Sequence, residues 1–478
     1  MRIGSRILKA IASSTLATMI ISGSQVVQIA TLARHLPETD LGLMAVVLMI
    51  VGLTQAIQDM GLSNAIIQRR SISKSQLSSL YWLNIVFGII LTTGIYIVGP
   101  TIALFFKEPR LIEIIMLLSP VFLIGSLGSQ YRVLYQKNLN FVLLETVNVL
   151  AALLALVLTL YFIFSDFGIL ALIYAIILQS LFANLSFLIF GGYKFGFPRF
   201  EYNHSDLSGF YSFGVFQMGE RLVNYSASNF DKILVGKFLG MELLGSYNLA
   251  WQLVIFPLTK ISPVIGKVAF PVFSKIQSDD EKTNEFYILN LKFLGILMFP
   301  VFIFMFLFPE ETVTVFYGRD MTAVIEILPL FAFLGLLKAI GSPGGAVILS
   351  KGFANVGFYW NIFISLISLV SLYWALMLWP GLHTPIVTLL IVFLTIGNLW
   401  HYLVRRFGHI RYRPVLMSVA QLFFAVLGIG FIVKHLVYSM FIENLIIQLI
   451  VAFVLSFFFY SIYLYVWERK LLTLIRKF

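Results

Sequence analysis

The residues that could do chemistry gather in Ser208–Gly240, a stretch of roughly thirty residues, long enough to cross a bilayer with some tilt. It carries two adjacent charge pairs, Glu220–Arg221 and Asp231–Lys232. At a helical rotation of about 100° per residue, these charges share an arc of roughly 140° with Asn224 and Tyr225. Because ions that face lipid cost several kcal/mol each, the stripe must face protein or water. It predicts the wall of a hydrated cavity; the alternative is two internal ion pairs.

Further cations lie in other apolar stretches, and the excess of charge inside these stretches is positive. Lys260 and Lys267 are seven residues apart and share one helical face. Such a surface suits a pyrophosphate, which Arg and Lys bind through charge-assisted hydrogen bonds. Neighbouring polar and aromatic groups could meet sugar hydroxyls and ring faces, or could instead form helix–helix hydrogen bonds. The candidate substrate-binding residues are Arg221, Lys260, Lys267, Lys338, Lys232, Asn224, Tyr225, Gln25 and Gln28.

Carboxylates within apolar stretches are the candidates for ion coupling. A buried carboxylate can carry a proton or a cation, because desolvation disfavours its bare charged form. Asp59 is preferred over Glu145, which could simply reach water or Arg132. Glu220 and Asp231 complete the set of ion-coupling candidates. The sequence has no cysteine, scattered histidines and no Gly-Lys-Ser/Thr loop, so neither a metal site, a cofactor nor ATP binding is predicted.

The composition shows which elements must position these residues. Charged residues make up 12% of 478, and the mean hydropathy is +0.94. This indicates an all-α polytopic membrane protein, and the net charge of +11 is explained by basic loops rather than by nucleic acid. Apolar windows predict about fourteen spans near 9–33, 40–67, 77–98, 110–136, 141–164, 168–190, 206–239, 242–270, 286–308, 322–350, 355–378, 383–404, 414–437 and 442–467.

The distribution of Lys and Arg predicts the orientation of these spans. With the N-terminus inside, 21 of the 33 basic residues fall in inside loops and six fall on the outside. Because basic residues concentrate in cytoplasmic loops, both termini are predicted to be cytoplasmic.

The chain also repeats itself. Arg34–Leu36 and Leu41–Gly42 match Lys237–Leu239 and Leu244–Gly245 at a constant offset of 203 residues. Two six-helix copies in the same orientation are typical of transporters that alternate between two open states. The predicted parts are an N-lobe at 1–190, a cytoplasmic linker at 191–207, a C-lobe at 208–404, and two additional helices with a basic tail at 405–478.

Several stretches resemble the Wzx-type polysaccharide repeat-unit flippases of the multidrug/oligosaccharidyl-lipid/polysaccharide (MOP) exporter superfamily, in the colanic-acid and teichuronic-acid branch. They are Leu32–Ile50, Asp59–Arg70, Asn229–Trp251 and Ala269–Lys282. The resemblance implies a two-lobed fold of fourteen helices that moves undecaprenyl-pyrophosphate-linked oligosaccharide across the bacterial plasma membrane, without enzymatic activity. It implies that the substrate is a lipid-linked oligosaccharide. It leaves open whether a proton or sodium ion is coupled to transport, and whether a polysaccharide polymerase and chain-length machinery are partners.

Three alternatives stay open at this point. A multidrug or cation exporter of the same superfamily would have about twelve spans and an acidic cavity, whereas the cations here exceed the carboxylates. A lipid II flippase is a close functional relative that the sequence does not separate. A membrane polymerase or ligase would need a large outside loop with catalytic Arg or His, and the longest predicted outside loop is only Pro309–Met321.

Overall fold

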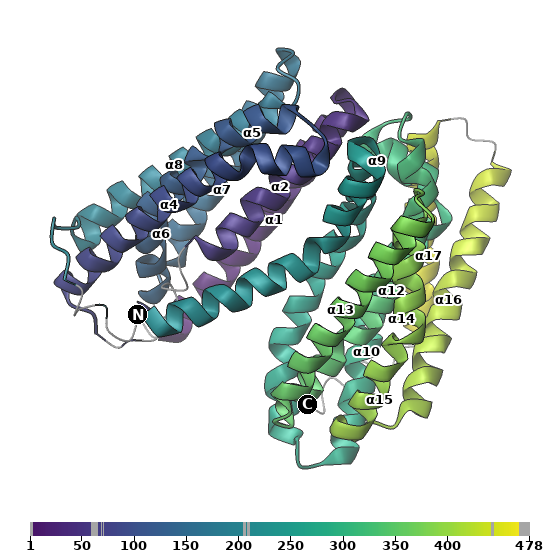
Figure 1. The fold of residues 1–478 in the computed structure, drawn as a ribbon. Helices are drawn as coiled ribbons and strands as arrows, with labels where there is room; N and C mark the ends of the chain where they lie inside the picture. The colour runs from purple at the N-terminus through teal and green to yellow at the C-terminus, as the bar shows by residue number, and fades with distance from the viewer. Residues whose placement is uncertain are drawn as a thin grey trace. The chain divides into compact units, whose positions relative to one another are not determined.

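The computed structural model describes residues 3–58, 66–67, 69, 71–203, 207, 211–440 and 444–467, which are helical with short connections (Figure 1). Thirteen of the helical segments in this part of the chain are long and apolar enough to cross a membrane. With no water in the hydrocarbon core, a helix satisfies every backbone hydrogen bond internally. The prediction of an all-α polytopic membrane protein is confirmed.

One of these segments, Gln217–Ile276, is 60 residues long and would extend roughly 90 Å, about three bilayer cores, if it were one straight helix. It belongs to α9 (Tyr211–Ile276), whose helical geometry is interrupted at Gly240, with φ of 88° and ψ of 179°. This backbone conformation is essentially restricted to glycine. Gly240 therefore divides α9 into two spans, at the boundary predicted between 239 and 242, which gives fourteen spans.

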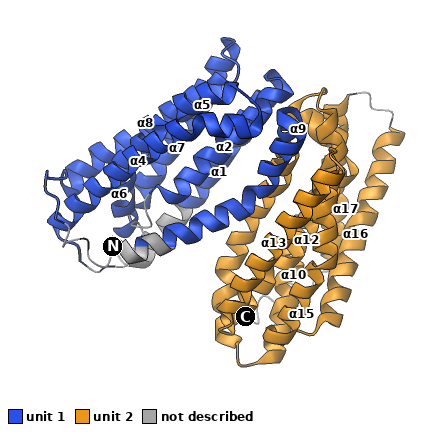
Figure 2. Cartoon of the chain, in the orientation of Figure 1, with its two compact units in different colours: residues 1–245 blue, residues 246–478 orange. Residues whose placement is uncertain are grey.

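The chain divides into two compact units, residues 1–245 and 246–478 (Figure 2). In the first unit α1 packs on α7, while α6 packs on both α4 and α8. Its helices are α1 (Ile3–His35), α2 (Glu38–Ile57), α4 (Lys74–Phe106), α5 (Arg110–Leu118), α6 (Pro120–Lys137), α7 (Phe141–Phe164), α8 (Leu170–Phe195) and the first part of α9.

In the second unit α10 packs against both α12 and α16, and α16 packs against α17. The helices of this unit are the second part of α9, α10 (Asp280–Leu307), α11 (Pro309–Tyr317), α12 (Thr322–Ser350), α13 (Ala354–Leu378), α14 (Thr384–Thr395), α15 (Gly397–Gly408), α16 (Tyr412–Ser439) and α17 (Leu445–Trp467). Packing thus divides the chain at Gly245, while the lobe and linker boundaries derived from the repeat stay a prediction.

The segment that follows α8 is fixed to α4 within the first unit. The Arg199 backbone N–H donates to the Ser78 hydroxyl at 3.1 Å, and the Trp82 indole donates to the Arg199 carbonyl at 2.7 Å. The Asn203 N–H donates to the Ser79 hydroxyl at 3.0 Å. These bonds satisfy backbone groups that have no helical partner, so this part of the predicted linker follows a defined course.

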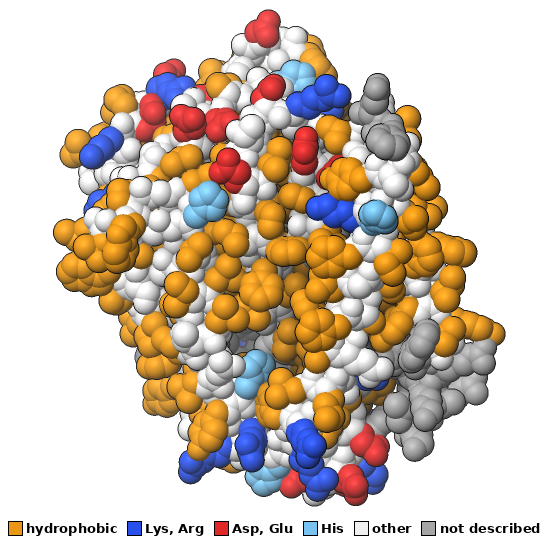
Figure 3. All heavy atoms as spheres, turned by 90° about the vertical axis from the view of Figure 1, so that its right-hand side faces the viewer, with side chains coloured by type: hydrophobic (Ala, Val, Ile, Leu, Met, Phe, Trp, Pro, Cys, Tyr) orange, Lys and Arg blue, Asp and Glu red, His pale blue; other side chains and the backbone are white. Residues whose placement is uncertain are grey.

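The surface matches a bilayer environment. In Figure 3, hydrophobic side chains form a broad band across the middle of the visible face, and charged side chains gather toward its upper and lower ends. Large apolar residues are widely exposed, among them Leu104 at 80% and Phe457 at 68%. Such extensive apolar exposure would be unfavourable in water, so this band is the lipid-facing surface.

Two helical features differ from the predicted spans. The span predicted at 110–136 consists of α5 and α6, which meet at Ser119 because Pro120 starts a new helix and lacks a backbone N–H. The predicted loop Pro309–Met321 contains the short helix α11, whose buried Val313 and Tyr317 pack into the second unit. Hydropathy alone does not register either feature, because nine residues are too few for a spanning window.

Candidate functional site

The charged stripe predicted on α9 lies in the first unit and is anchored to α2 by Tyr225. The Tyr225 hydroxyl donates to the Met49 carbonyl at 3.0 Å. Arg221 and Lys232 are half-buried, whereas Glu220 and Asn224 are exposed. Tyr225 is therefore a positioning residue that holds this face of α9 against α2.

Asp231 is the most buried charged residue of the stripe, with 7% of its surface exposed. A buried carboxylate is stable only with compensating polar or charged groups nearby. Because Lys232 follows directly on the helix, a local positive charge is available to it. This arrangement agrees with a paired role for the two residues, and their roles in substrate binding and ion coupling stay predictions.

The polar residues predicted on α1 connect this helix to α7. The Gln28 amide donates to the Thr159 hydroxyl at 2.6 Å, and the Ser14 hydroxyl donates to a Glu145 carboxylate oxygen at 2.8 Å. Gln25 is exposed beside them. Gln28 thus makes the helix–helix hydrogen bond that is the alternative to sugar binding, and Glu145, predicted to couple an ion or to reach water or Arg132, accepts a hydrogen bond from α1. Asp59, the preferred ion-coupling candidate, lies outside the described residues.

The repeated turn segments pack against each other inside the first unit. A Cβ atom at Gly245 would lie 2.6 Å from the Glu38 carbonyl oxygen, and one at Gly42 would collide with the backbone of Met241. Gly245 and Met241 follow Gly42 and Glu38, respectively, by the repeat offset of 203 residues. The contact is therefore reciprocal, as in a pair of elements related by a two-fold axis. This geometry supports the internal repeat.

The other predicted cations, Lys260, Lys267 and Lys338, belong to the second unit. Lys267 is exposed, and the Lys260 ammonium lies 5.6 Å from the centre of the Phe256 ring. The Lys338 ammonium lies 4.6 Å from the ring centre of Trp251 and 5.4 Å from that of Phe393. Cation–π contacts of this kind stabilise an ammonium group in an apolar helix bundle.

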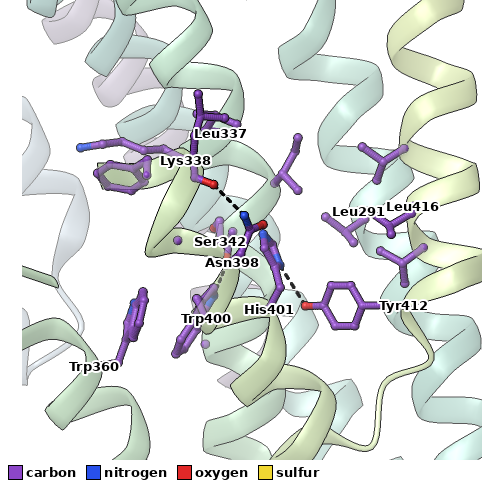
Figure 4. A pocket seen from close by; sticks show the side chains of 18 of the residues that line it. Leu291, Leu337, Lys338, Ser342, Trp360, Asn398, Trp400, His401, Tyr412 and Leu416 are labelled. Atoms are coloured by element: carbon purple, nitrogen blue, oxygen red, sulfur yellow. Dashed lines mark hydrogen bonds between the residues drawn. The ribbon is translucent and has the colours of Figure 1, made fainter. Parts of the chain in front are cut away.

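Lys338 also borders a cavity of about 700 Å³ within the second unit, which we call the aromatic pocket (Figure 4). Its walls come from α10, α12, α13, α14, α15 and α16. Ligand sites typically occupy about 300–1,000 Å³ and combine an apolar lining with a few polar groups. The polar and aromatic side chains of the lining are Tyr287, Lys338, Ser342, Trp360, Asn361, Phe393, Asn398, Trp400, His401 and Tyr412.

Two tryptophans form one wall of the aromatic pocket. The rings of Trp360 and Trp400 are stacked, with centres 5.4 Å apart and planes inclined by 26°. The Trp400 indole N–H donates to the Gly341 carbonyl at 3.0 Å. This bond ties α15 to α12 and fixes the orientation of the Trp400 ring.

A second wall carries imidazole and phenol groups. His401 Nδ1 lies 3.0 Å from the Tyr412 hydroxyl, and both side chains point into the same region in Figure 4. Sequence reasoning missed Trp360, Trp400 and His401 as site residues. A signal was present, because Asn398 and His401 are three residues apart and so share a face of an otherwise apolar span.

Among the residues that the structure describes, no group of three or more His, Cys, Asp or Glu side chains could hold a metal ion. The aromatic pocket has one cation, Lys338, and no carboxylate in its lining. Its chemistry is therefore that of a binding site for a largely neutral, polar ligand with apolar faces, rather than a site for an organic cation.

Comparison with known proteins places the chain in a family. A family model described as "Polysaccharide biosynthesis protein" matches residues 31–326. The teichuronic acid biosynthesis protein TuaB of Bacillus subtilis is 34% identical over 361 residues, which cover 75% of this chain and 74% of that protein. The lipopolysaccharide biosynthesis protein WzxC of Escherichia coli is 32% identical, covering 73% and 71% of the two chains.

Solved structures share the fold. The lipid II flippase MurJ in an inward closed conformation aligns with a TM-score of 0.71 over 96% of this chain and 100% of that one, at 15% identity. An inward-facing multidrug resistance MATE transporter of the MOP superfamily aligns with a TM-score of 0.63 over 86% and 98%, at 17% identity. The chain therefore belongs to the polysaccharide biosynthesis protein family, as do TuaB and WzxC, and it has the fold of MurJ and of the MATE transporters.

Proposed function

We propose that this protein moves undecaprenyl-pyrophosphate-linked oligosaccharide repeat units from the cytoplasmic to the outer leaflet of the bacterial plasma membrane. The observation that carries this proposal is the 34% identity to a teichuronic acid biosynthesis protein over three quarters of both chains. This fold is compatible with movement of a lipid-linked headgroup, since MurJ, which has it, is a lipid II flippase. The product would feed the synthesis of a surface polysaccharide, such as an exopolysaccharide, a lipopolysaccharide or an O-antigen.

In this proposal the protein is a transporter without catalytic residues, and its cations recognise the pyrophosphate. Arg221 and Lys232 would contribute from the first unit, and Lys260, Lys267 and Lys338 from the second. Arg and Lys suit this role because each supplies charge-assisted hydrogen bonds to phosphate oxygens. Transport would proceed by alternating access through a basic cavity, as sequence repeats of this kind favour.

A coupled proton or sodium ion would be carried by Asp59, Glu220, Asp231 or Glu145. Of the three that the structure describes, Asp231 is buried, Glu145 is half-buried and Glu220 is exposed. A buried carboxylate is the better ion carrier, since its charge must be compensated by a bound ion or a neighbouring group.

The proposal is tested by deleting the gene in the organism that makes the protein. Lipid-linked repeat units should accumulate on the cytoplasmic leaflet, and the surface polysaccharide should disappear. A plasmid copy of the wild-type gene should restore both to normal. Unchanged surface polysaccharide in the deletion strain would contradict the proposed function.

A second candidate, lipid II flipping, is favoured by the TM-score of 0.71 to MurJ. At 15% identity that likeness shows the fold alone. We therefore expect that this protein does not restore growth to cells depleted of their lipid II flippase, although it is inserted into their membrane. Restored growth would favour lipid II as the substrate.

A further inference from the structure

We propose that the aromatic pocket of the second unit binds the oligosaccharide part of the substrate, while Lys338, one of the cations proposed to recognise the pyrophosphate, borders it. This inference rests on the proposed function, and it identifies the residues that would contact sugar rings. The pocket has a volume of about 700 Å³ and lies wholly among α10, α12, α13, α14, α15 and α16. It offers flat aromatic faces, neutral hydrogen-bonding groups and free volume.

The aromatic faces come from the stacked pair of Trp360 and Trp400. A pyranose ring has an apolar face of C–H groups and a rim of hydroxyls, so it packs on an indole face and bonds to polar groups around it. The indole N–H of Trp400 is used by the Gly341 carbonyl. The Trp400 ring is thereby held in place, and it supports the Trp360 ring stacked on it, so that the pair forms a rigid aromatic platform at little entropic cost.

Three polar groups of the pocket are available to a ligand. Ser342 and Asn361 are both exposed, and neither side chain has a hydrogen-bond partner among the residues that the structure describes. His401 uses only Nδ1 in its contact with Tyr412, which leaves Nε2 for a ligand. An amide, a hydroxyl and an imidazole nitrogen together can both donate to and accept from sugar hydroxyls.

The charge of the pocket argues against a phosphate or a cation as the group bound deepest. The lining contains no carboxylate, and its one cation is Lys338. In Figure 4 the Lys338 ammonium is directed away from Ser342 and His401, toward the edge of the pocket, and it contacts the rings of Trp251 and Phe393. A neutral glycan therefore fits the interior, and the charged end of the same molecule would lie nearer to Lys338.

Free volume in the pocket comes from glycines where the helices would otherwise carry side chains. Cβ atoms added at Gly345 and Gly357 would meet no atom within 4 Å. Apolar side chains at these positions would fill the pocket without displacing its walls. A polyprenyl chain is a poorer occupant of this space than a sugar. The amide and imidazole groups of the pocket would then face hydrocarbon without hydrogen bonds, which costs free energy.

The test is a binding measurement with the full-length protein in lipid nanodiscs. One probe is the lipid-linked oligosaccharide extracted from the cells that make the protein, and the other is sugar-free undecaprenyl phosphate. We expect Gly357→Leu and Trp360→Ala each to weaken binding of the glycan probe by about tenfold or more, with binding of undecaprenyl phosphate unchanged. Trp360→Phe should retain much of the affinity, because it keeps an aromatic face.

Gly428→Leu is the matched control, since Gly428 also has no atom within 4 Å of an added Cβ and lies on α16 outside the pocket lining. It should bind both probes as the wild type does. Unchanged affinity for the glycan probe in both pocket variants would overturn the inference. An equal loss of affinity for both probes would also overturn it, because that result would assign the pocket to the prenyl chain. A wild-type protein that binds neither probe would overturn the proposed function itself, together with this inference.

Discussion

At the scale of single residues, substitutions of Arg221 distinguish two roles for this side chain, which are binding of the substrate and an internal ion pair. The side chain is half-buried on α9, within a segment that spans the membrane. If it binds the pyrophosphate, Arg221→Ala should abolish export of the glycan while the protein is still made and inserted. Arg221→Lys should retain part of the activity, because it keeps the charge and loses the bidentate fork. Export is measured as surface polysaccharide, and insertion by immunoblots of membranes.

The matched control for Arg221 is Lys237→Ala, which removes another cation of the same helix. Lys237 is exposed, and its ammonium lies 4.6 Å from the Phe105 ring. Transport should survive this change. A double variant, Glu220→Gln/Arg221→Gln, that recovers both abundance and export would show an internal ion pair and defeat the ligand assignment.

The coupling carboxylate is the second prediction at this scale. If Asp59 carries the ion, Asp59→Asn should stop transport and leave abundance intact, because the amide is nearly isosteric and cannot carry a proton. Glu145→Gln is the comparison, since a glutamine carbonyl can still accept the hydrogen bond from Ser14. Flipping is measured in proteoliposomes with and without a proton or sodium gradient. Full, gradient-dependent activity of the asparagine variant would remove Asp59 from this role.

Single residues were predicted from the sequence less completely than helices were. Charge within an apolar span is visible in a sequence, so Arg221 and Lys338 could be selected. Which neighbours they contact depends on packing between distant helices. The contact of Lys338 with Phe393, and the stack of Trp360 on Trp400, join residues of different helices. Periodicity within one helix contains no information about such contacts.

At the scale of helices, Gly240 sets the break in α9. Its φ of 88° and ψ of 179° are strained for any residue with a Cβ atom. Gly240→Ala should therefore lower the stability by about 1–3 kcal/mol, measured by thermal or denaturant unfolding in detergent. Gly428→Ala, an exposed position inside α16, should be neutral or slightly stabilising, because alanine favours a helix interior. If the two substitutions change the stability equally, the backbone of Gly240 tolerates a Cβ atom and the prediction is wrong.

Asn284 joins α10 to the connection between α15 and α16. Its amide donates to the His409 carbonyl at 3.0 Å, and its carbonyl accepts from the Arg411 N–H at 2.6 Å. Asn284→Ala removes the partner of these two part-buried backbone groups, at a cost of about 1–3 kcal/mol. The expected result is a lower unfolding temperature in detergent.

Asn355→Ala is the control for Asn284, because Asn355 is exposed and makes no hydrogen bond within the described structure. Its unfolding temperature should equal that of the wild type. If both alanine variants unfold at the same temperature, the bonds of Asn284 contribute nothing measurable.

Helix boundaries could be predicted well where an apolar run is uniform. The spans predicted at 141–164 and 322–350 coincide with α7 and α12. They were predicted less well where local backbone chemistry decides. Pro120 starts a new helix inside one apolar run, and α11 forms in a segment too short for a hydropathy window.

At the scale of the whole molecule, hydropathy and family resemblance were sufficient for the fold class. The resemblance at Asn229–Trp251 includes Gly240 and Gly245, and both carry local structural constraints. Such constraints keep short segments recognisable between distant relatives. The lining of the aromatic pocket is not one continuous stretch of sequence, because it comes from six helices. These residues become neighbours only in the folded chain.

The orientation of the molecule in the membrane is the last prediction. Basic residues concentrate in one set of connections, which predicts that both termini and the segment around Lys194 lie in the cytoplasm. Reporter fusions after Lys194 and after Lys477 should both be active in the cytoplasm, and a fusion within Pro309–Met321 should be active outside. Opposite sides for Lys194 and Lys477 would require an odd number of spans between them. That result would contradict two copies in the same orientation, because the second copy and the two added helices contribute an even number.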